Sequence, residues 1–233
     1  SDACSVQAAI GAVNAVAFDI SAACAGFIFA MNIVEGFFKA GIYKTALIIG
    51  AETLSKVTDW SDRGTCVLFG DGAGAAVLKA EETGIIDMMM GADGTKGDVL
   101  ACTSRTVGNF LTGTKPELGF MTMDGQEVFK FAVRKVPESV IELLQRTGTK
   151  KEDIKYYVLH QANERIIEAA ARRLKEPMEK FPMTIGQFGN TSTASIPLLL
   201  DDMIRKDMLK RGDKIIMSGF GAGMTWGAVL MEW

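Results

Sequence analysis

The sequence predicts an α/β protein made of two related halves. Short apolar segments, typical of buried strands, alternate with longer apolar or amphipathic segments that are typical of helices. Their order repeats along the chain: a turn of small residues opens an apolar helix, a glycine follows it, and a buried strand and a glycine-containing apolar segment come next. This repeat indicates one supersecondary unit that the chain uses twice.

The first copy of this unit lies in residues 1–90. Residues 16–20 (VAFDI) are predicted to form a short buried strand, and residues 24–40 form a nearly wholly apolar helix that Gly41 ends. Further strands are predicted at residues 46–50, 66–69, 75–78 and 84–90.

The second copy lies in residues 124–233, after a connecting region at 91–123 that is rich in Gly and Thr and is predicted to be mainly loop. The copy opens with a predicted helix at 124–147, in which Pro137 should cause a kink or a break. Its other elements are a strand at 156–159, helices at 164–174 and 193–209, and strands at 214–218 and 228–232.

Composition excludes several classes of function. The 25 Lys and Arg against 28 Asp and Glu leave a net charge of −3, which gives no electrostatic footprint for nucleic acid. The apolar runs are too short, and too often broken by glycine or charge, to span a membrane. Four cysteines without a CxxC pair, together with a single histidine, leave no Cys/His metal site. They favour free thiols in a reducing compartment, which predicts the cytoplasm.

Cys24 is the first candidate for chemistry. It lies in FDISAACAGF, where a predicted strand ends and a helix begins. Backbone N–H groups at a helix N-terminus favour a thiolate and can also hold an oxyanion. A small buried thiol on an apolar helix explains the segment as well, so this segment by itself leaves both interpretations open.

Two further candidates follow in the second copy. His160, the only histidine, stands where a strand stops and a helix starts, so its imidazole could donate a hydrogen bond or move a proton. A satisfied core histidine is the alternative. Asn190 lies in the turn QFGNTSTAS before a helix, where a capping or turn role is the alternative.

The remaining motifs give weaker signals. Gly70–Ala75 (GDGAGA) fits a dinucleotide fingerprint, but the chain continues as a short strand and not as the helix that such a site needs, so no dinucleotide is expected. Arg165, Arg172 and Arg173 share one face of the helix after His160, and Lys130 adds charge to the preceding helix. These cations form either a solvated face or a landing patch for an acidic partner.

In combination, the motifs closely resemble the β-ketoacyl-acyl-carrier-protein synthase III family. The segments DISAACAGF, DRGTCVLFGDGAGAAVL, HQAN, GNTSTAS and GFGAGMTWGAVL occur in the family's order, and the resemblance runs from about Cys4 to Trp233. It implies the thiolase fold, with duplicated α/β halves stacked as α-β-α-β-α layers, and a homodimer. It also implies condensation of a short acyl-CoA with malonyl-acyl carrier protein, which initiates type II fatty acid synthesis without a metal or a cofactor.

The same resemblance implies a role for individual residues. Cys24 would be the acylated nucleophile, His160 and Asn190 would complete the catalytic site, and the backbone of Cys24, Ala222 and Gly223 would hold the oxyanion. The implied coenzyme A contacts are Arg63, Phe129 and Asn163. The implied carrier-protein contacts are Gln161, Ala162, Asn163, Glu164, Arg165, Lys130, Arg172 and Arg173.

Two other classes of function stay open at this point. One is a related condensing enzyme of secondary metabolism that uses coenzyme A or a carrier protein. The other is a non-catalytic partner subunit with the same fold, against which the intact Cys24, His160 and Asn190 argue. The single histidine excludes the two-histidine pattern of the elongating synthases. Asn190 also helps to discriminate relatives, because thiolases have a second cysteine among the catalytic partners.

The repeat also predicts that the first half is incomplete in this chain. About 65 residues of helix, strand and helix precede the turn at Asn190, whereas 23 residues precede Cys24. If the halves are duplicates, at least about 40 residues with a strand–helix unit are missing. We therefore expect the isolated 233-residue chain to be inactive or nearly so.

Overall fold

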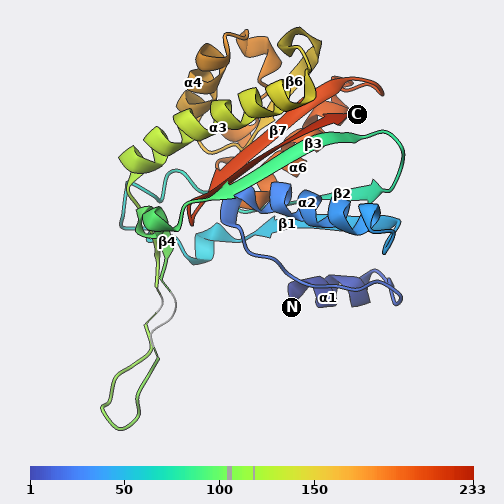
Figure 1. The fold of residues 1–233 in the computed structure, drawn as a ribbon. Helices are drawn as coiled ribbons and strands as arrows, with labels where there is room; N and C mark the ends of the chain where they lie inside the picture. Colours follow the sequence, from blue (N-terminus) through green and yellow to red (C-terminus); the bar gives the residue numbers. More distant parts are fainter. Residues whose placement is uncertain (104–106, 118) are drawn as a thin grey trace.

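The computed structural model describes residues 1–103, 107–117 and 119–233, and its elements stack in layers (Figure 1). A four-stranded sheet with the order β3-β8-β7-β6 forms the centre. Within it, β6 and β7 are parallel, and β8 is antiparallel to both of its neighbours. The strands are β3 (Ile85–Ala92), β6 (Ile154–Leu159), β7 (Lys214–Gly221) and β8 (Thr225–Glu232).

Helices cover both faces of this central sheet. On one face lie α3 (Gly125–Thr147) and α4 (Glu164–Leu174), which also pack against each other. On the other face lie α2 (Gly26–Lys39) and α6 (Ser195–Arg205). Because both faces are covered, β7 is apolar along nearly its whole length, and all of its residues except the first are buried.

A second, smaller sheet lies on the far side of α2 and α6. It consists of β1 (Thr45–Glu52) and β2 (Gly72–Lys79), which are antiparallel. Figure 1 shows helix α1 (Asp2–Ala9) beyond this sheet, and no residue of α1 is buried. The packed layers therefore run α-β-α-β, with α1 outside them.

The internal repeat that the sequence predicts is visible where the two middle helices begin. A single 3₁₀ turn precedes each helix: Ala23–Ala25 before α2, and Ser192–Ala194 before α6. A Cβ added at Gly50 in β1 would come 2.7 Å from the carbonyl oxygen of the middle residue of the second turn. A Cβ added at Gly219 in β7 would come 3.4 Å from the carbonyl oxygen of the middle residue of the first turn. The two halves thus pack against each other's turns in an equivalent way.

Several predicted elements differ from the structure. Residues 16–20 and 66–69 were predicted to be strands but form none, and in the second segment Phe69 makes only an isolated parallel bridge with Asn190. Helix α1 was not predicted, and its sequence has no apolar face. Pro137 does not end α3, which runs on to Thr147. Strand β3 crosses the predicted boundary at residue 90 and pairs with β8, so the division into 1–90, 91–123 and 124–233 stays a prediction.

The connecting region is more structured than the predicted loop. It contains the 3₁₀ segment η3 (Gly94–Val99), and β4 (Leu100–Cys102) pairs with β5 (Met121–Met123). The other short helices are η2 (Leu54–Lys56), η4 (Lys151–Asp153), η5 (Met178–Lys180) and α5 (Ile185–Phe188).

Three compositional predictions bear on the fold. All four cysteines are free thiols, as the sequence predicts. Among the residues that the structure describes, no helix has both the length and the hydropathy needed to cross a membrane. In the same part of the chain, no three His, Cys, Asp or Glu side chains gather in a way that could hold a metal ion.

Candidate active site

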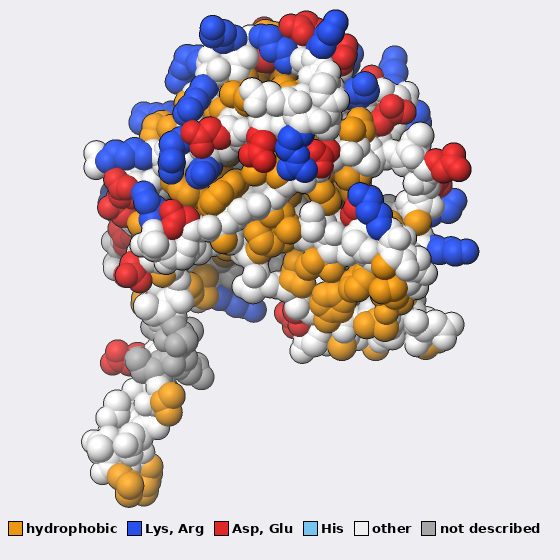
Figure 2. Space-filling view, viewed as in Figure 1, with side chains coloured by type: hydrophobic (Ala, Val, Ile, Leu, Met, Phe, Trp, Pro, Cys, Tyr) orange, Lys and Arg blue, Asp and Glu red, His pale blue; other side chains and the backbone are white. Residues whose placement is uncertain are grey.

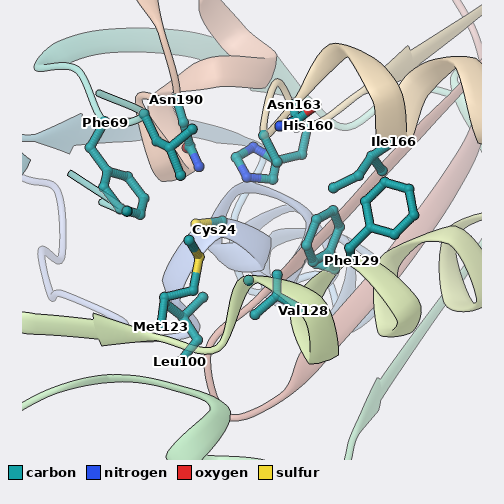
Figure 3. A pocket seen from close by; sticks show the side chains of 15 residues that line it. Cys24, Phe69, Leu100, Met123, Val128, Phe129, His160, Asn163, Ile166 and Asn190 are labelled. Atoms are coloured by element: carbon teal, nitrogen blue, oxygen red, sulfur yellow. The ribbon is translucent and has the colours of Figure 1, made fainter. Parts of the chain in front are cut away.

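A pocket of about 210 Å³ lies where the two halves meet, and Cys24, His160 and Asn190 all line it (Figure 3). The three residues are far apart in the sequence, and the fold brings them to one cavity. Most of the other walls are apolar. The remaining lining residues are Gly64, Leu68, Phe69, Leu100, Met123, Gly125, Val128, Phe129, Ala162, Asn163, Ile166 and Phe220.

Cys24 is the middle residue of the first 3₁₀ turn, and that turn is held from both sides. The Thr193 hydroxyl donates to the Ala23 carbonyl at 2.7 Å, and the Thr225 hydroxyl donates to the Ala22 carbonyl at 3.1 Å. Gly221 packs so closely that an added Cβ would lie 2.5 Å from the Cys24 nitrogen. The glycine at 221 is therefore required for β7 to approach the turn.

Of the two interpretations that the sequence left open for Cys24, the structure favours the buried neutral thiol over the thiolate. Burial is the largest effect and raises the pKa of the Cys24 thiol to about 11. A hydrogen bond with the Ser192 side chain lowers this pKa, and the Glu52 carboxylate raises it. The free protein consequently holds a neutral thiol at pH 7, because loss of solvent outweighs the helix N-terminus.

The raised pKa makes a testable prediction for the reactivity of Cys24. In the full-length protein, the rate of alkylation by iodoacetamide should rise about tenfold per pH unit above pH 7, because the thiolate fraction grows until the pH reaches the pKa. Glu52→Gln should raise the rate at pH 8 severalfold, since it removes the negative charge but keeps an acceptor oxygen. Mass spectrometry of the Cys24 peptide measures both rates, and a plateau below pH 8 would contradict the prediction.

His160 lies directly after β6, and its backbone N–H donates to the Ser218 carbonyl at 2.8 Å. The side chain is 2% exposed, and burial lowers the pKa of His160 to about 3, so the imidazole is neutral at pH 7. Its Nδ1 lies 2.6 Å from the Ser195 hydroxyl. The ring also makes an edge-on contact with Phe220, with ring centroids 5.5 Å apart.

The backbone of Asn190 is hydrogen-bonded to the backbone of residues 68–70 in the first half. Its N–H donates to the Leu68 carbonyl at 2.9 Å, and its carbonyl accepts from the Gly70 N–H at 2.9 Å. The side-chain Oδ1 accepts from the Ser192 N–H at 2.9 Å, which is the turn role that the sequence offered as the alternative. This bond leaves the amide NH₂ as the end that can face the pocket, so the two interpretations of Asn190 are compatible.

The predicted coenzyme A and oxyanion residues take different positions. Phe129 and Asn163 line the pocket, and Asn163 also caps α4 by accepting from the Arg165 N–H at 2.9 Å. Arg63 is exposed and lies beside the pocket-lining Gly64. Ala222 and Gly223 stand outside the lining, in the turn between β7 and β8. The Thr225 hydroxyl that contacts the Ala22 carbonyl also lies 3.2 Å from the Ala222 carbonyl oxygen.

Among the predicted carrier-protein contacts, Gln161 has no free surface. It is 1% exposed, its amide nitrogen donates to the Leu159 carbonyl at 2.8 Å, and its amide oxygen accepts from the Thr184 N–H at 2.9 Å. Its side chain therefore holds the loop after β6, and its contact with a carrier protein stays a prediction. Ala162 lines the pocket, and Glu164 is exposed at the first turn of α4.

The predicted basic face lies over α3 and α4, where Figure 2 shows acidic side chains among the Lys and Arg side chains. Arg172 pairs with Glu168 at 3.6 Å. Arg165 is exposed and has no ion pair within the described part of the chain. The other two cations of this face, Lys130 and Arg173, form ion pairs with glutamates of α3.

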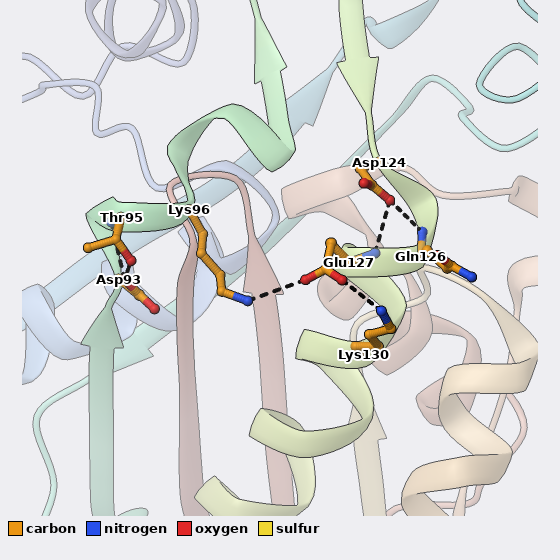
Figure 4. Close-up of polar contacts among 7 residues, drawn as sticks. All are labelled: Asp93, Thr95, Lys96, Asp124, Gln126, Glu127 and Lys130. Atoms are coloured by element: carbon orange, nitrogen blue, oxygen red, sulfur yellow. Dashed lines mark hydrogen bonds and ion pairs between the residues drawn. The ribbon is translucent and has the colours of Figure 1, made fainter.

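Lys130 and Arg173 each have a structural partner on α3. Glu127 binds Lys130 at 2.8 Å and Lys96 at 3.5 Å, next to the Asp124 cap of α3 (Figure 4). Arg173 pairs with Glu138 at 3.4 Å and donates to the Val133 carbonyl at 3.3 Å. Proline at 137 cannot donate to this carbonyl, so Arg173 supplies the hydrogen bond that the helix lacks there.

The sequence interpretation missed the residues that support the catalytic candidates. The Ser195 hydroxyl contacts the His160 ring. The Ser192 hydroxyl donates to the Glu52 carboxylate at 3.1 Å, and the Ser192 side chain also contacts Cys24. Leu68 and Phe69 bring an apolar wall from the first half. The serine-rich turn NTSTAS was a signal for the first two, but its hydrogen-bond partners lie far away in the sequence.

The chemistry of this pocket suits covalent acyl transfer. A thiol can accept an acyl group, and two neutral hydrogen-bond donors can stabilise negative charge on a thioester oxygen without a change of their own protonation. With the duplicated layered fold, these features define the class of thiolase-fold condensing enzymes.

Comparison with known proteins narrows the class to one family. Two family models match the chain: 3-oxoacyl-[acyl-carrier-protein (ACP)] synthase III over residues 18–94, and the C-terminal domain of the same family over residues 144–233. The β-ketoacyl-[acyl-carrier-protein] synthase III of Clostridium novyi (strain NT) is 53% identical over 235 residues, which cover 100% of this chain and 72% of that protein. The chain belongs to the β-ketoacyl-acyl-carrier-protein synthase III family. The terms β-ketoacyl and 3-oxoacyl in these names denote the same group.

Other relatives and solved structures agree with this assignment. The synthase III of Clostridium acetobutylicum is 51% identical, covering 99% of this chain and 72% of that protein. The crystal structure of the Aquifex aeolicus VF5 synthase III matches with a TM-score of 0.90 and 45% identity, covering 99% of this chain and 71% of that one. The Pseudomonas aeruginosa PAO1 structure matches with a TM-score of 0.92 and 39% identity, covering 99% and 72%. The fold is the thiolase fold that the sequence predicts.

Proposed function

We propose that this protein condenses a short acyl-CoA with malonyl-acyl carrier protein, with loss of CO₂, and so initiates type II fatty acid synthesis. The observation that carries the proposal is the convergence of Cys24, His160 and Asn190 on one mainly apolar pocket. Membership of the synthase III family supports the same reaction. The reaction needs no metal and no redox cofactor.

The first half-reaction is acylation of Cys24. The sulfur attacks the thioester carbonyl of the acyl-CoA, a new S–C bond forms, and the bond to the coenzyme A sulfur breaks. The thiol proton ends on the released coenzyme A. Backbone N–H groups of Cys24 and of the turn at Ala222 and Gly223 are proposed to hold the oxyanion, since Gly221 brings that turn against the Cys24 nitrogen.

The second half-reaction joins the two substrates. The malonyl group loses CO₂, and the electron pair of the broken C–C bond forms an enolate whose oxygen is held by His160 and Asn190. The enolate carbon attacks the acyl carbonyl on Cys24, and the sulfur leaves and takes a proton from solvent. Both donors suit this step, because the Asn190 amide has its oxygen engaged by Ser192 and the His160 ring is neutral.

Substrate entry is proposed from the side of the pocket that Phe129 and Asn163 line, with Arg63 nearby at the surface. Carrier docking is assigned to the exposed part of α4 around Arg165. A homodimer is also proposed, since the outward face of the β1–β2 sheet exposes Leu47, Ile49 and Val77. The four free thiols support a cytoplasmic location.

The proposed reaction is tested with the purified full-length protein, acetyl-CoA and either malonyl-carrier or malonyl-CoA. We expect 3-oxoacyl-carrier protein and CO₂ with the first acceptor, and little product with the second. Preference for malonyl-CoA would indicate a related condensing enzyme with a different acceptor. Absence of acyl transfer to any acceptor would indicate a non-catalytic subunit.

Charge reversal at Arg165 should weaken carrier binding. We expect Arg165→Glu to raise the KM for malonyl-carrier protein severalfold, because charges at the rim of an interface act mainly on association. The KM of the variant should also depend less on salt concentration than the KM of the wild type. The rate of acyl uptake from acyl-CoA should not change. Lys44→Glu makes the same charge change on an exposed residue before β1 and serves as the control. An equal KM in the two variants would leave α4 as an ordinary solvated face.

A further inference from the structure

Ser195 makes the closest polar contact of the catalytic histidine. It is the first residue of α6 and is 2% exposed, so its hydroxyl has no access to bulk solvent. Its Oγ lies 2.6 Å from Nδ1 of His160. The same Oγ accepts a hydrogen bond from the Gln161 backbone N–H at 3.3 Å.

These two bonds determine where the hydroxyl proton points. A backbone N–H can only donate, so the Ser195 oxygen is the acceptor in its bond with Gln161. Within the described residues, the only acceptor left for the Ser195 proton is Nδ1 of His160. In the opposite arrangement His160 would donate to Ser195, and a buried hydroxyl proton would be left without a partner. Nδ1 is therefore the unprotonated nitrogen.

We infer that Ser195 is a positioning residue that holds His160 in the tautomer with the proton on Nε2. The imidazole then presents a hydrogen-bond donor to the pocket, at the wall that it shares with Asn190 (Figure 3). This inference rests on the proposed function, because a donor is what an enolate oxygen requires and an acceptor would repel it. Ser195 thus does for His160 what Ser192 does for Asn190: each orients a donor.

The experiment measures the tautomer directly in the full-length protein labelled with ¹⁵N. Long-range ¹H–¹⁵N spectra between pH 6 and 8 separate a protonated from an unprotonated ring nitrogen, and His160→Gln identifies the signals by their loss. We expect the wild-type ring to carry its proton on Nε2. In Ser195→Ala, the Nδ1-protonated form should become detectable, and CO₂ release from malonyl-carrier should fall about 10- to 100-fold.

Two comparisons separate a positioning role from a structural one. Uptake of the acyl group by Cys24 should stay within about twofold in Ser195→Ala, because this step does not use the tautomer. Ser139→Ala removes another buried hydroxyl, which donates to the Val136 carbonyl at 2.8 Å, and should leave both the spectrum and CO₂ release unchanged.

A wild-type ring protonated on Nδ1 would overturn the inference, and this result does not depend on the folding of any variant. An Nε2-protonated ring with full CO₂ release in Ser195→Ala would overturn it as well. If the wild-type protein shows no condensation at all, the proposed function fails, while the spectrum still decides the tautomer.

Discussion

Replacing Cys24 with alanine is expected to abolish acyl transfer by the full-length protein. Among the described residues, Cys24 supplies the one thiol that lines the pocket, so no other described group there can form the thioester intermediate. The expected loss of condensation exceeds about 10³-fold, the scale seen when a covalent nucleophile is removed. Mass spectrometry after incubation with a short acyl-CoA should show the acyl mass on the wild-type Cys24 peptide and on no peptide of the variant.

Cys66→Ala and Cys102→Ala are the matched controls. Neither cysteine lines the pocket, and Cys102 is exposed at the end of β4. Both variants should be labelled at Cys24 at nearly the wild-type rate. Acyl label on a different cysteine of the wild-type protein would reject the assignment of the nucleophile.

His160→Ala and Asn190→Ala are expected to separate the two half-reactions. Each variant loses one hydrogen-bond donor to the enolate oxygen, so release of CO₂ from malonyl-carrier should fall about 10²- to 10³-fold. Acyl uptake by Cys24 should change much less, because the proposed oxyanion donors of that step are backbone N–H groups. The measurement pairs acyl labelling with CO₂ release in the same preparations.

Folding must be compared in these variants, since both residues are buried and Asn190 holds the Ser192 N–H. Thermal unfolding should show an intact cooperative transition, and Asn14→Ala, at an exposed position, should behave as wild type in every assay. A variant that cannot be acylated but still releases CO₂ at the wild-type rate would reverse the proposed roles.

The sequence by itself determined the class of fold and the identity of the candidate residues. Helix α4 begins and ends where predicted, since its amphipathic pattern follows a capping asparagine, Asn163. Cys24, His160 and Asn190 stand at junctions between apolar segments and turns, and such junctions are local features that one sequence displays. The repeat of the unit also needs no structure to be seen.

Strand pairing was decided by the tertiary structure. Residues 16–20 are mainly apolar, but they form no strand and their Asp19 carboxylate accepts from the Asp2 and Ala3 N–H groups, whereas β1 has a partner strand, β2, to bond with. Of the predicted kink or break at Pro137, the break is absent, and Arg173 from another helix donates to the Val133 carbonyl that the proline leaves free. Both outcomes depend on a neighbour that is distant in the chain, and local sequence propensity carries no information about such a neighbour.

The state of the site was likewise decided by tertiary contacts. A helix N-terminus next to Cys24 favours a thiolate, but burial raises its pKa to about 11. The proton of His160 is placed by Ser195, 35 residues away in the sequence. Solvation and hydrogen-bond partners are set by whatever the fold packs around a group, so the residue type was readable from the sequence whereas its protonation and orientation required the folded chain.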